Sequence, residues 1–514
     1  MSANDTYVHQ ILEVLSREPG KVVLTGGGIA MTAAEFDGLV RSAAQLLHRH
    51  IAAEPAASAP VVGILTATNT PATLILRYAA NLVGATVVHL HTTNAVDPND
   101  PLPTHAAHRA VAETKVTVLA VDAGNLDRAR VLGAGAAAPI RLAALGDLGP
   151  DVLDLTGGDP TFDAADIAIA PDRIAVVTYT SGTTGKPKGI AVDFRARRGF
   201  ITAGLQMAWR ATYLATLPMS HSSGQAADDS LASGGAVIMH DGFAPGAVLR
   251  AIEEHRITRM LISPPQLYLL MDHPDVTTTD LSSLAMLCYT GAPSSRKRLA
   301  DAVRIFGQVL IQIYGTTEAA AITMLGPAEH LDPGLLGTTG RPLFAQVRIR
   351  DQEDGRDLPT GEIGEICVRS PFRMAEYVGD PELTARTVRD GWLHTGDLGF
   401  VDERGYLTIR GRMSEVVKTN GIKIYPAAVE DAFLAHPEVA QAAVFPVVDQ
   451  DRIEYLHAAV VLRDPGAATE DELRTHIAAE ISPKHVPARI HLRDALPLTG
   501  VGKPDKALLA KTAG

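Results

Sequence analysis

The chain is poor in cysteine. Its 514 residues contain only Cys288 and Cys367, and each stands among apolar neighbours (MLCY and EICV). Isolated cysteines in such surroundings are typical of buried thiols in a reducing compartment. Two cysteines alone cannot complete a tetrahedral zinc site, so a structural zinc ion is not expected.

Long apolar runs are also missing. No stretch reaches the roughly 18 apolar residues that a membrane-spanning helix requires. The N-terminal residues, MSANDTYVHQILEVL, have no basic region followed by an apolar stretch, which argues against a signal peptide. We therefore expect a cytoplasmic protein without a membrane span.

Positive charge is scarce, because the formal net charge is -12. Nucleic-acid binding depends on clustered Lys and Arg, so this balance argues against a nucleic-acid partner but not against a local basic pocket. The contents of hydrophobic residues (46%) and charged residues (20%) are those of an ordinary globular protein. The length exceeds what one hydrophobic core usually serves, which predicts at least two domains.

The chain alternates strand-like and helix-like segments. Branched apolar residues dominate 60–65, 85–90, 115–121 and 173–180, and helical spacing covers 71–84. This alternation predicts an α/β fold in which a large N-terminal domain has mainly parallel sheets covered by helices. Thr32 and Glu35 form a capping-box pattern that predicts a helix start. The segments 51–60 and 131–140 are rich in Ala, Pro and Gly and predict surface loops.

The residue pattern of the sequence changes from about residue 337. Short strands broken by Gly and Asp predict a small antiparallel β-subdomain. After Arg412 we expect an α+β unit with a helix from about Ala427, strands near 442–447 and 456–462, a helix over 470–481 and a last strand near 488–494. The predicted domains are therefore 1–411, a hinge at 412–414, and a mobile C-terminal domain at 415–514.

Residues 178–189 (TYTSGTTGKPKG) follow an apolar strand and combine glycine, hydroxyl and lysine residues. Glycines let backbone N–H groups converge on an anion, and the hydroxyl and ammonium groups add donors and charge. The spacing is not that of a Walker A loop, which argues against an ordinary P-loop ATPase or kinase. The segment predicts a phosphate-binding loop made of Thr180, Ser181, Gly182, Thr183, Thr184, Gly185, Lys186 and Lys188.

Five further motifs follow in order: 289–293 (YTGAP), 312–318 (QIYGTTE), 396–397 (GD), 410–412 (RGR) and 497–503 (PLTGVGK). Together with the loop, they make the whole chain similar to the adenylate-forming superfamily of acyl-CoA synthetases, firefly luciferase and peptide-synthetase adenylation domains. The resemblance is closest to acyl- or aryl-CoA ligases. It implies ATP-dependent conversion of a carboxylic acid to an acyl-adenylate, with release of pyrophosphate.

The resemblance also implies roles for individual residues. Two anions react, so cations and oriented donors must surround the α-phosphate, and Mg²⁺ is the expected metal. Glu318 would hold the metal, Thr317 would contact the α-phosphate, and Asp397 with Arg412 would bind the ribose. The adenine side would be formed by Gly291, Ala292, Pro293, Gln312 and Tyr314, and Gly315 and Thr316 would belong to the signature around the α-phosphate and metal.

The lysine that ends the last motif, Lys503, is the expected catalytic cation of adenylation. In similar proteins the small domain carries this lysine and then rotates for a second step. The hinge position is commonly Asp or Lys in them, whereas this chain has Ser414. Lys418 and Gly421 match residues that act in the rotated state, the glycine beside a pantetheine tunnel.

The resemblance places the acid pocket along residues 217–235 and around Thr290. His221 matches a gating residue, and Ser222 stands where amino-acid-adenylating domains carry an Asp, which disfavours an α-amino acid substrate. The other pocket candidates are Ser223 and Asp228. Asp228 and the adjoining Asp229 are either solvated charges or contacts for a basic or hydroxylated acid.

Three acceptors for the acyl group stay open: coenzyme A, a carrier-protein pantetheine in trans, and a free amine. Coenzyme A is favoured because it is the frequent acceptor among similar proteins, and an amide synthetase is the main alternative. A non-catalytic nucleotide-binding protein is disfavoured because Lys503, Glu318 and the phosphate-binding loop are all present.

Overall fold

A computed structural model of the chain describes residues 6–53, 60–67, 69–90, 104–180, 187–206, 210–419, 422–448, 454–499 and 503–513. Its contacts divide the chain into two compact units. Unit 1 comprises residues 1–244, 251–261 and 371–386, and unit 2 comprises 245–250, 262–370 and 387–514. The predicted hinge at 412–414 stays a prediction; Ser414 lies in a 3₁₀ turn, Met413–Glu415.

Unit 1 contains an eight-stranded sheet in the order β19-β9-β8-β4-β3-β5-β6-β7. The pairings between β8 and β7 along this order are parallel, and β8–β9 and β9–β19 are antiparallel. This confirms the predicted parallel sheet. The strands are β3 (Val61–Leu65), β4 (Thr86–His89), β5 (Val118–Val121), β6 (Arg141–Ala144), β7 (Val152–Asp154), β8 (Ile174–Thr180), β9 (Lys188–Asp193) and β19 (Glu376–Tyr377).

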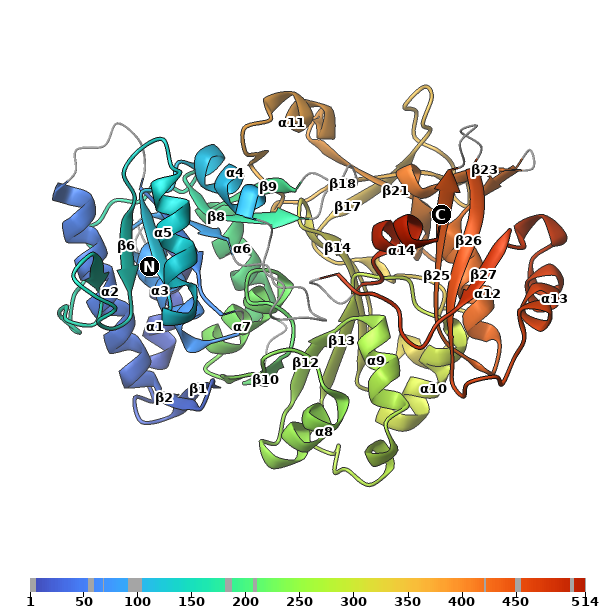
Figure 1. The fold of residues 1–514 in the computed structure, drawn as a ribbon, viewed down its shortest axis with the longest axis horizontal. Helices are drawn as coiled ribbons and strands as arrows, with labels where there is room; N and C mark the ends of the chain where they lie inside the picture. Colours follow the sequence, from blue (N-terminus) through green and yellow to red (C-terminus); the bar gives the residue numbers. More distant parts are fainter. Residues whose placement is uncertain are drawn as a thin grey trace. The chain divides into compact units, whose positions relative to one another are not determined.

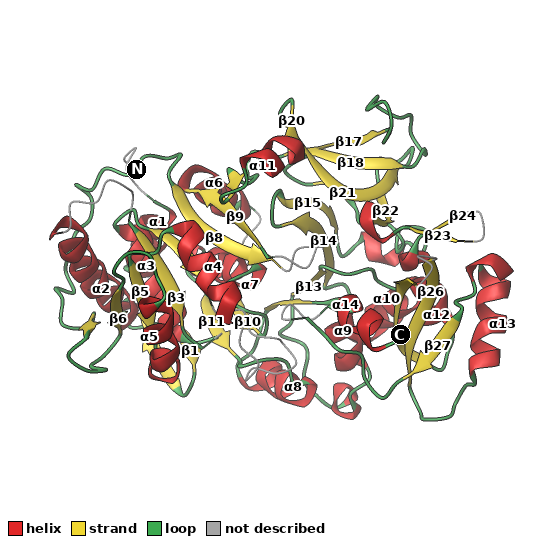
Figure 2. Ribbon diagram, turned by 45° about the horizontal axis from the view of Figure 1, so that its top comes forward, coloured by secondary structure: helices red, strands yellow, loops and turns green. Residues whose placement is uncertain are grey.

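Helices cover both faces of this sheet. Ala107 and Val111 of α4 (Thr104–Thr114) and Leu132 of α5 (Leu126–Ala134) share one buried cluster with strand residues, and Figure 2 shows these helices across the strands. The other face packs against α3 (Pro71–Leu82), which begins with Pro71 at its first turn. Loops were expected over 51–60 and 131–140. Helix α2 (Ala33–Ala53) covers the first residues of one segment and α5 those of the other, whereas 135–140 are not helical and 54–59 lie outside the described residues.

The N-terminal helices of unit 1 pack with two helices that come much later in the chain. The predicted capping box is confirmed, since Thr32 N–H donates to Glu35 and Glu35 N–H donates to Thr32 at the start of α2. Helix α1 (Tyr7–Leu15) contacts α6 (Phe194–Leu205) and α7 (Ser222–Ala232). Nearby strands are β1 (Val22–Gly26), β2 (Ile29–Thr32), β10 (Thr212–Ala215), β11 (Ala236–Met239) and β12 (Arg259–Ile262).

Unit 2 contains strands that carry the predicted nucleotide motifs. Strand β13 (Met286–Thr290) runs parallel to β14 (Leu310–Thr316), and β14 runs antiparallel to β15 (Ala320–Leu325). Two helices, α9 (Pro264–Met271) and α10 (Arg296–Phe306), flank β13 in the sequence. The predicted β-subdomain is the antiparallel sheet of β17 (Gln346–Arg350), β18 (Gly364–Arg369), β20 (Val388–Arg389), β21 (Trp392–Val401) and β22 (Leu407–Arg412).

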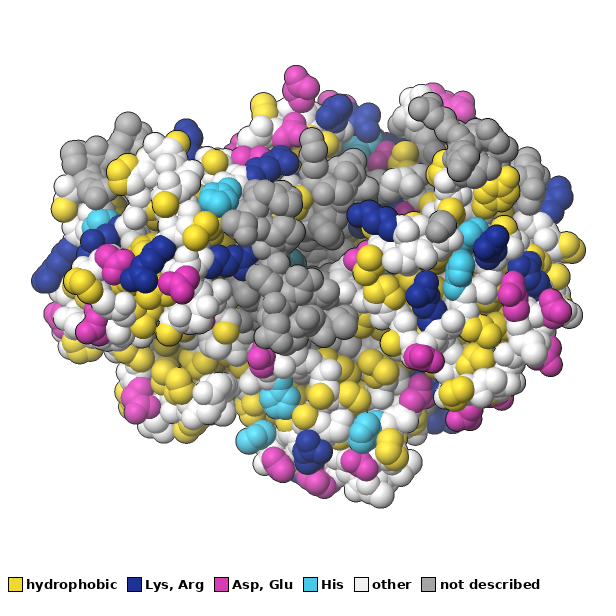
Figure 3. Space-filling model, viewed as in Figure 1, with side chains coloured by type: hydrophobic (Ala, Val, Ile, Leu, Met, Phe, Trp, Pro, Cys, Tyr) yellow, Lys and Arg dark blue, Asp and Glu magenta, His cyan; other side chains and the backbone are white. Residues whose placement is uncertain are grey.

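The C-terminal segment of unit 2 has the predicted α+β elements (Figure 1). They are β23 (Val417–Thr419), β24 (Ile422–Ile424), α12 (Pro426–Ala435), β25 (Val439–Val448), β26 (Glu454–Leu462), α13 (Glu470–Glu480), β27 (Arg489–Leu492) and α14 (Lys506–Thr512). The other α-helices and strands are α8 (Pro245–Glu254), α11 (Pro381–Thr387) and β16 (Arg341–Pro342). None of the helices in the described ranges is long and apolar enough to cross a membrane. Acidic and basic side chains are interspersed on the face shown in Figure 3.

Candidate functional site

The predicted phosphate-binding loop connects β8 to β9 in unit 1. Thr180 and Lys188 are register partners at the open end of this antiparallel pair. The ammonium of Lys188 lies 5.6 Å from the ring centre of Tyr377. The loop residues Ser181, Gly182, Thr183, Thr184, Gly185 and Lys186 lie outside the described residues.

In unit 2, the ends of β13 and β14 hold the predicted adenine-side residues together. The hydroxyl of Thr290 donates to the carbonyl of Ile313 (2.6 Å), and the hydroxyl of Tyr289 donates to Gln312 (3.1 Å). Gly291, followed by Ala292 and Pro293, has φ +90, a left-handed conformation that favours glycine. A Cβ atom at Gly291 would lie 2.9 Å from Cε of Lys503, so the two residues are neighbours.

The turn after β14 carries the predicted metal and phosphate residues. Gly315 lies at an irregularity in the β14–β15 register, and the hydroxyl of Thr316 accepts the backbone N–H of Ala319 (3.1 Å). Thr317 is exposed, and Glu318 is partly buried.

Asp397 is a buried carboxylate on β21 with protein partners on both oxygens. The hydroxyl of Tyr314 donates to Oδ2 (2.7 Å), and Nε of Arg412 lies 3.1 Å from Oδ1. Burial raises the pKa of Asp397, while Arg412, Tyr314 and Lys503 oppose that shift. The sequence motifs at 312–318, 396–397 and 410–412 are thus brought together.

A second group of side chains fixes the turn that precedes Asp397. Nδ1 of His394 lies 2.7 Å from Glu365, and the other Glu365 oxygen accepts the N–H of Gly396 (3.3 Å). Cys367 completes a trio whose ligand atoms lie within 4.8 Å of one another. Burial raises the pKa of Cys367 to about 12, and its sulfur lies 3.3 Å from Nδ1 of His394. Because Glu365 contacts both His394 and the N–H of Gly396, these side chains orient the turn before Asp397.

Lys503 lies partly buried near these groups in unit 2. Burial lowers its pKa and Arg412 adds to this effect, whereas Asp397, Glu415 and Glu318 oppose it. Two hydrogen bonds fix the backbone at Lys503: Thr499 N–H donates to the carbonyl of Lys503 (2.7 Å), and Lys503 N–H donates to the hydroxyl of Thr499 (3.3 Å).

The sequence motifs did not indicate how the Lys503 turn is anchored. The ammonium of Lys506 lies 3.3 Å from Glu415 and 2.8 Å from Glu430. These contacts join the start of α14 to the segment after Arg412 and to α12. A lysine three residues after Lys503 was visible in the sequence, but its carboxylate partners are 76 or more positions away and could not be paired with it.

In unit 1, His221 and its neighbours form the turn before α7. Residues 219–224, which include this turn and the start of α7, are called the His221 turn below. Nδ1 of His221 lies 2.8 Å from the hydroxyl of Ser220. Ser222 is exposed, while Ser223 is buried with its hydroxyl 2.8 Å from that of Tyr213.

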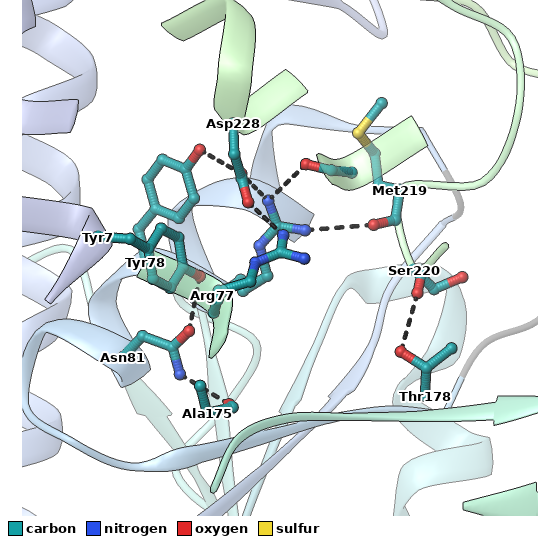
Figure 4. Close-up of polar contacts among 11 residues, drawn as sticks. Tyr7, Arg77, Tyr78, Asn81, Ala175, Thr178, Met219, Ser220 and Asp228 are labelled. Atoms are coloured by element: carbon teal, nitrogen blue, oxygen red, sulfur yellow. Dashed lines mark hydrogen bonds and ion pairs between the residues drawn. The ribbon is translucent and has the colours of Figure 1, made fainter. Parts of the chain in front are cut away.

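The two aspartates of α7 are buried and not solvated. Asp228 has no exposed surface; it forms ion pairs with Arg77 and Arg197 and accepts the hydroxyl of Tyr78 (2.6 Å), as Figure 4 shows in part. Asp229 is buried beside Arg259 (3.5 Å). The expectation that Asp228 meets the acid is therefore replaced, because this carboxylate has no exposed surface and is neutralised by two buried arginines.

Two residues predicted for a rotated state are not tested by the structure. Lys418 lies in β23, where its register partner is Lys423, and Gly421 lies outside the described residues.

Comparisons with known proteins identify the family of the chain. The AMP-binding enzyme family matches residues 12–378, and its C-terminal domain matches 428–503. The chain is 34% identical over 520 residues to the medium/long-chain-fatty-acid–CoA ligase FadD8 of Mycobacterium tuberculosis, covering 97% of this chain and 88% of that protein. It is 32% identical to a feruloyl-CoA synthase of Amycolatopsis sp over 94% of both chains.

A solved structure is similar over nearly the whole length. The amide bond synthetase McbA from Marinactinospora thermotolerans has a TM-score of 0.86 and 33% sequence identity, covering 99% of both chains. The family match spans more than half of the chain, and the two relatives above cover nearly all of it. This chain therefore belongs to the AMP-binding family of adenylate-forming enzymes.

Proposed function

We propose that this enzyme activates a carboxylic acid with ATP, forms an acyl-adenylate and pyrophosphate, and passes the acyl group to coenzyme A. The observation that carries the proposal is the convergence of Lys503, Asp397 and Arg412 in unit 2, beside Gly291. A cation, a buried carboxylate and a guanidinium suit a nucleotide that must react at its α-phosphate.

Each of these groups has a distinct role in the proposal. Lys503 offsets charge on the acid and the α-phosphate as they approach each other, and its partial burial strengthens that interaction. Asp397 accepts hydrogen bonds from the ribose hydroxyls, and Arg412 holds the carboxylate in place. Tyr314, Gln312 and the 291–293 segment contact the adenine, and Thr317 contacts the α-phosphate.

Glu318 fits a magnesium ion by its chemistry. Mg²⁺ is held by one or two carboxylates together with substrate phosphates, and Glu318 is a partly buried carboxylate that lowers the local excess of positive charge from Lys503 and Arg412. When bound, the ion would neutralise phosphate charge during pyrophosphate departure.

The acid is assigned to the His221 turn, with Ser222 and Ser223 as its neighbours, and Thr290 is a further contact. The absence of an Asp at position 222 favours an acid without an α-ammonium group. The relatives act on fatty and feruloyl groups by their names, so aliphatic and aryl acids are the first to test.

Transfer to an amine is the second candidate. It is favoured by the similarity of the chain to an amide bond synthetase over 99% of both chains. Both candidates share the adenylation step and differ only in the nucleophile that follows.

The test is pyrophosphate release across a panel of aliphatic, aryl, heteroaryl and amino acids, with and without coenzyme A, with products identified by mass. A coenzyme A thioester supports the ligase. An amide formed from an added amine, with coenzyme A ignored, supports the second candidate. Release of no pyrophosphate with any acid would overturn the proposal.

Lys506→Met should lower the adenylation rate about tenfold, which corresponds to about 1.4 kcal/mol of barrier. The change leaves Glu415 and buried Glu430 without their shared cation, so the turn that carries Lys503 loses its anchor. The rate is measured as acid-dependent pyrophosphate release.

Lys511→Met, on the exposed side of the same helix, is the matched control and should retain the rate. Lys506→Arg should restore part of it. Equal rates for Lys506→Met and Lys511→Met would contradict the anchoring role.

The alkaline limb of the pH profile should report the Lys503 ammonium. Its pKa is lowered, chiefly by burial and then by Arg412, and the protonated form is the active one. Activity is therefore present below that pKa and lost as pH rises through it, at a lower pH than for an ordinary lysine. The measurement is kcat/KM for ATP against pH, which reports the free enzyme.

Arg412→Gln removes a neighbouring cation and should move this limb to higher pH. Arg412→Lys keeps the charge and should leave the limb in place. A limb at the same pH in both variants would show that Lys503 is not the group that titrates.

A further inference from the structure

Arg77 is a buried arginine that binds the backbone on both sides of His221. Its side chain is 2% exposed and points from α3 toward the turn before α7 (Figure 4). Nη1 donates to the carbonyl of Met219 (3.2 Å), and Nη2 donates to the carbonyl of Gly224 (3.2 Å). The planar guanidinium thus joins two carbonyls that bracket His221.

Asp228 holds Arg77 in this position from within α7. Its two oxygens pair with Arg77 and Arg197, and Tyr78 donates to the oxygen that faces Arg77. Two buried cations share one carboxylate, so the carbonyls of Met219 and Gly224 supply further acceptors for the two Nη groups of Arg77. Moving the turn away would leave buried guanidinium donors unsatisfied, which is costly.

Two other side chains fasten the same turn. The hydroxyl of Thr178 donates to the carbonyl of Ser220 (3.3 Å), and the N–H of Met219 donates to Asn69 (3.2 Å). Thr178 lies on β8, two residues before the phosphate-binding loop begins at Thr180. The turn is therefore tied to α3, to β8 and to the segment before α3.

Gly224 shows how closely Arg77 packs against the His221 turn. A Cβ atom at this position would lie 2.0 Å from the carbonyl oxygen of Met219 and 2.6 Å from Nη1 of Arg77. Only glycine lets the guanidinium and both carbonyls meet.

We propose that Arg77 is a positioning residue that sets the orientation of His221 for the acid substrate. Asp228 acts through Arg77, and Thr178 and Gly224 help to hold the same turn. These four residues together are called the clamp. The inference rests on the proposed function for its effect on catalysis. The inference assigns the clamp to recognition of the acid and not of ATP, because each of these hydrogen bonds is made to the His221 turn.

The test compares Arg77→Lys and Thr178→Val with Tyr7→Phe. Lysine keeps the charge but lacks the planar fork, and valine removes only a hydroxyl donor. Tyr7→Phe removes a buried hydrogen bond to Asn81 (2.6 Å) in the same helical layer, without touching the turn. Gly224→Ala is a fourth variant that keeps Arg77 and forces the turn apart.

Acid-dependent pyrophosphate exchange gives kcat/KM for the acid and KM for ATP, and thermal unfolding gives stability. Arg77→Lys and Gly224→Ala should lower kcat/KM for the acid by about 10- to 100-fold while KM for ATP changes by less than about twofold. Thr178→Val should show a smaller loss of the same kind. Tyr7→Phe should lower the melting temperature and keep the acid parameters.

A second readout does not depend on activity. In protein labelled with ¹³C-histidine, the ring resonance of His221, identified from its loss in His221→Gln, should shift in Arg77→Lys and Thr178→Val and stay in place in Tyr7→Phe.

The inference is overturned if the His221 resonance is the same in all variants, or if acid and ATP parameters fall together as stability falls. An unmodified enzyme that releases no pyrophosphate with any acid would overturn the proposed function instead, and the resonance would still decide the position of His221.

Discussion

Lys503→Ala should reduce the rate of acyl-adenylate formation by about 10²- to 10³-fold, the loss usually seen when one preorganised stabilising group is removed. The ammonium is proposed to offset two anionic reactants, and alanine leaves no cation at this position. Arg412 also lies near Lys503, but it is engaged by Asp397 and cannot replace it.

The same variant should convert a pre-made acyl-adenylate to product at a rate close to that of the unmodified enzyme. Negative charge from ATP no longer has to be offset once the adenylate exists. The two rates are measured separately, by pyrophosphate exchange and by consumption of synthetic adenylate with coenzyme A. Equal loss in both would contradict a role confined to the first step.

Lys511→Ala is the matched control for Lys503→Ala, since it removes an exposed lysine of the same C-terminal segment. It should change neither rate. Lys503→Arg tests geometry, because it keeps a cation on a side chain of different shape.

Asp397→Asn should raise KM for ATP by about 10- to 100-fold, as expected when a charged hydrogen-bond acceptor worth about 1.5–3 kcal/mol is lost. The carboxylate is buried between Tyr314 and Arg412, and the amide can offer only one oxygen to its neighbours and the ribose. Arg412 is then left without its ionic partner, which adds to the cost.

The decisive measurement uses 2′-deoxy- and 3′-deoxy-ATP beside ATP. The unmodified enzyme should prefer ATP, and Asp397→Asn should lose most of that preference. Glu403→Gln, an exposed carboxylate change at the β21–β22 turn, should leave the preference intact. Equal preference in Asp397→Asn and the unmodified enzyme would remove Asp397 from the ribose site.

The elements of the fold that depend on local signals were predictable. The apolar runs at 60–65 and 173–180 became β3 and β8, and the capping pattern at Thr32 and Glu35 opens α2. These signals lie within a few residues of one another, so no tertiary information is needed to use them. The starts of the loops expected over 51–60 and 131–140 are helical, because alanine has a high helix propensity and lets α2 and α5 continue to Ala53 and Ala134.

The candidate nucleotide-binding residues could be named from the sequence for a similar reason. Their motifs are compact, and their chemistry and order identify the family before any coordinate is known. Tyr314, Asp397 and Arg412 come together as the motifs predicted, although the tie from Tyr314 to Asp397 spans 83 positions.

The sequence by itself therefore determined the strands, the capped helices, the family and the main catalytic candidates. Only the tertiary structure decided that Asp228 belongs to Arg77 and Arg197, 151 and 31 positions away, and that Lys506 belongs to Glu415 and Glu430. The partner of a charged residue cannot be read from the sequence, because it depends on which helices pack together. The strength of the pair also depends on how completely that packing excludes water from the two charges. Burial turned Asp228 from a candidate substrate contact into the group that holds Arg77 against the His221 turn.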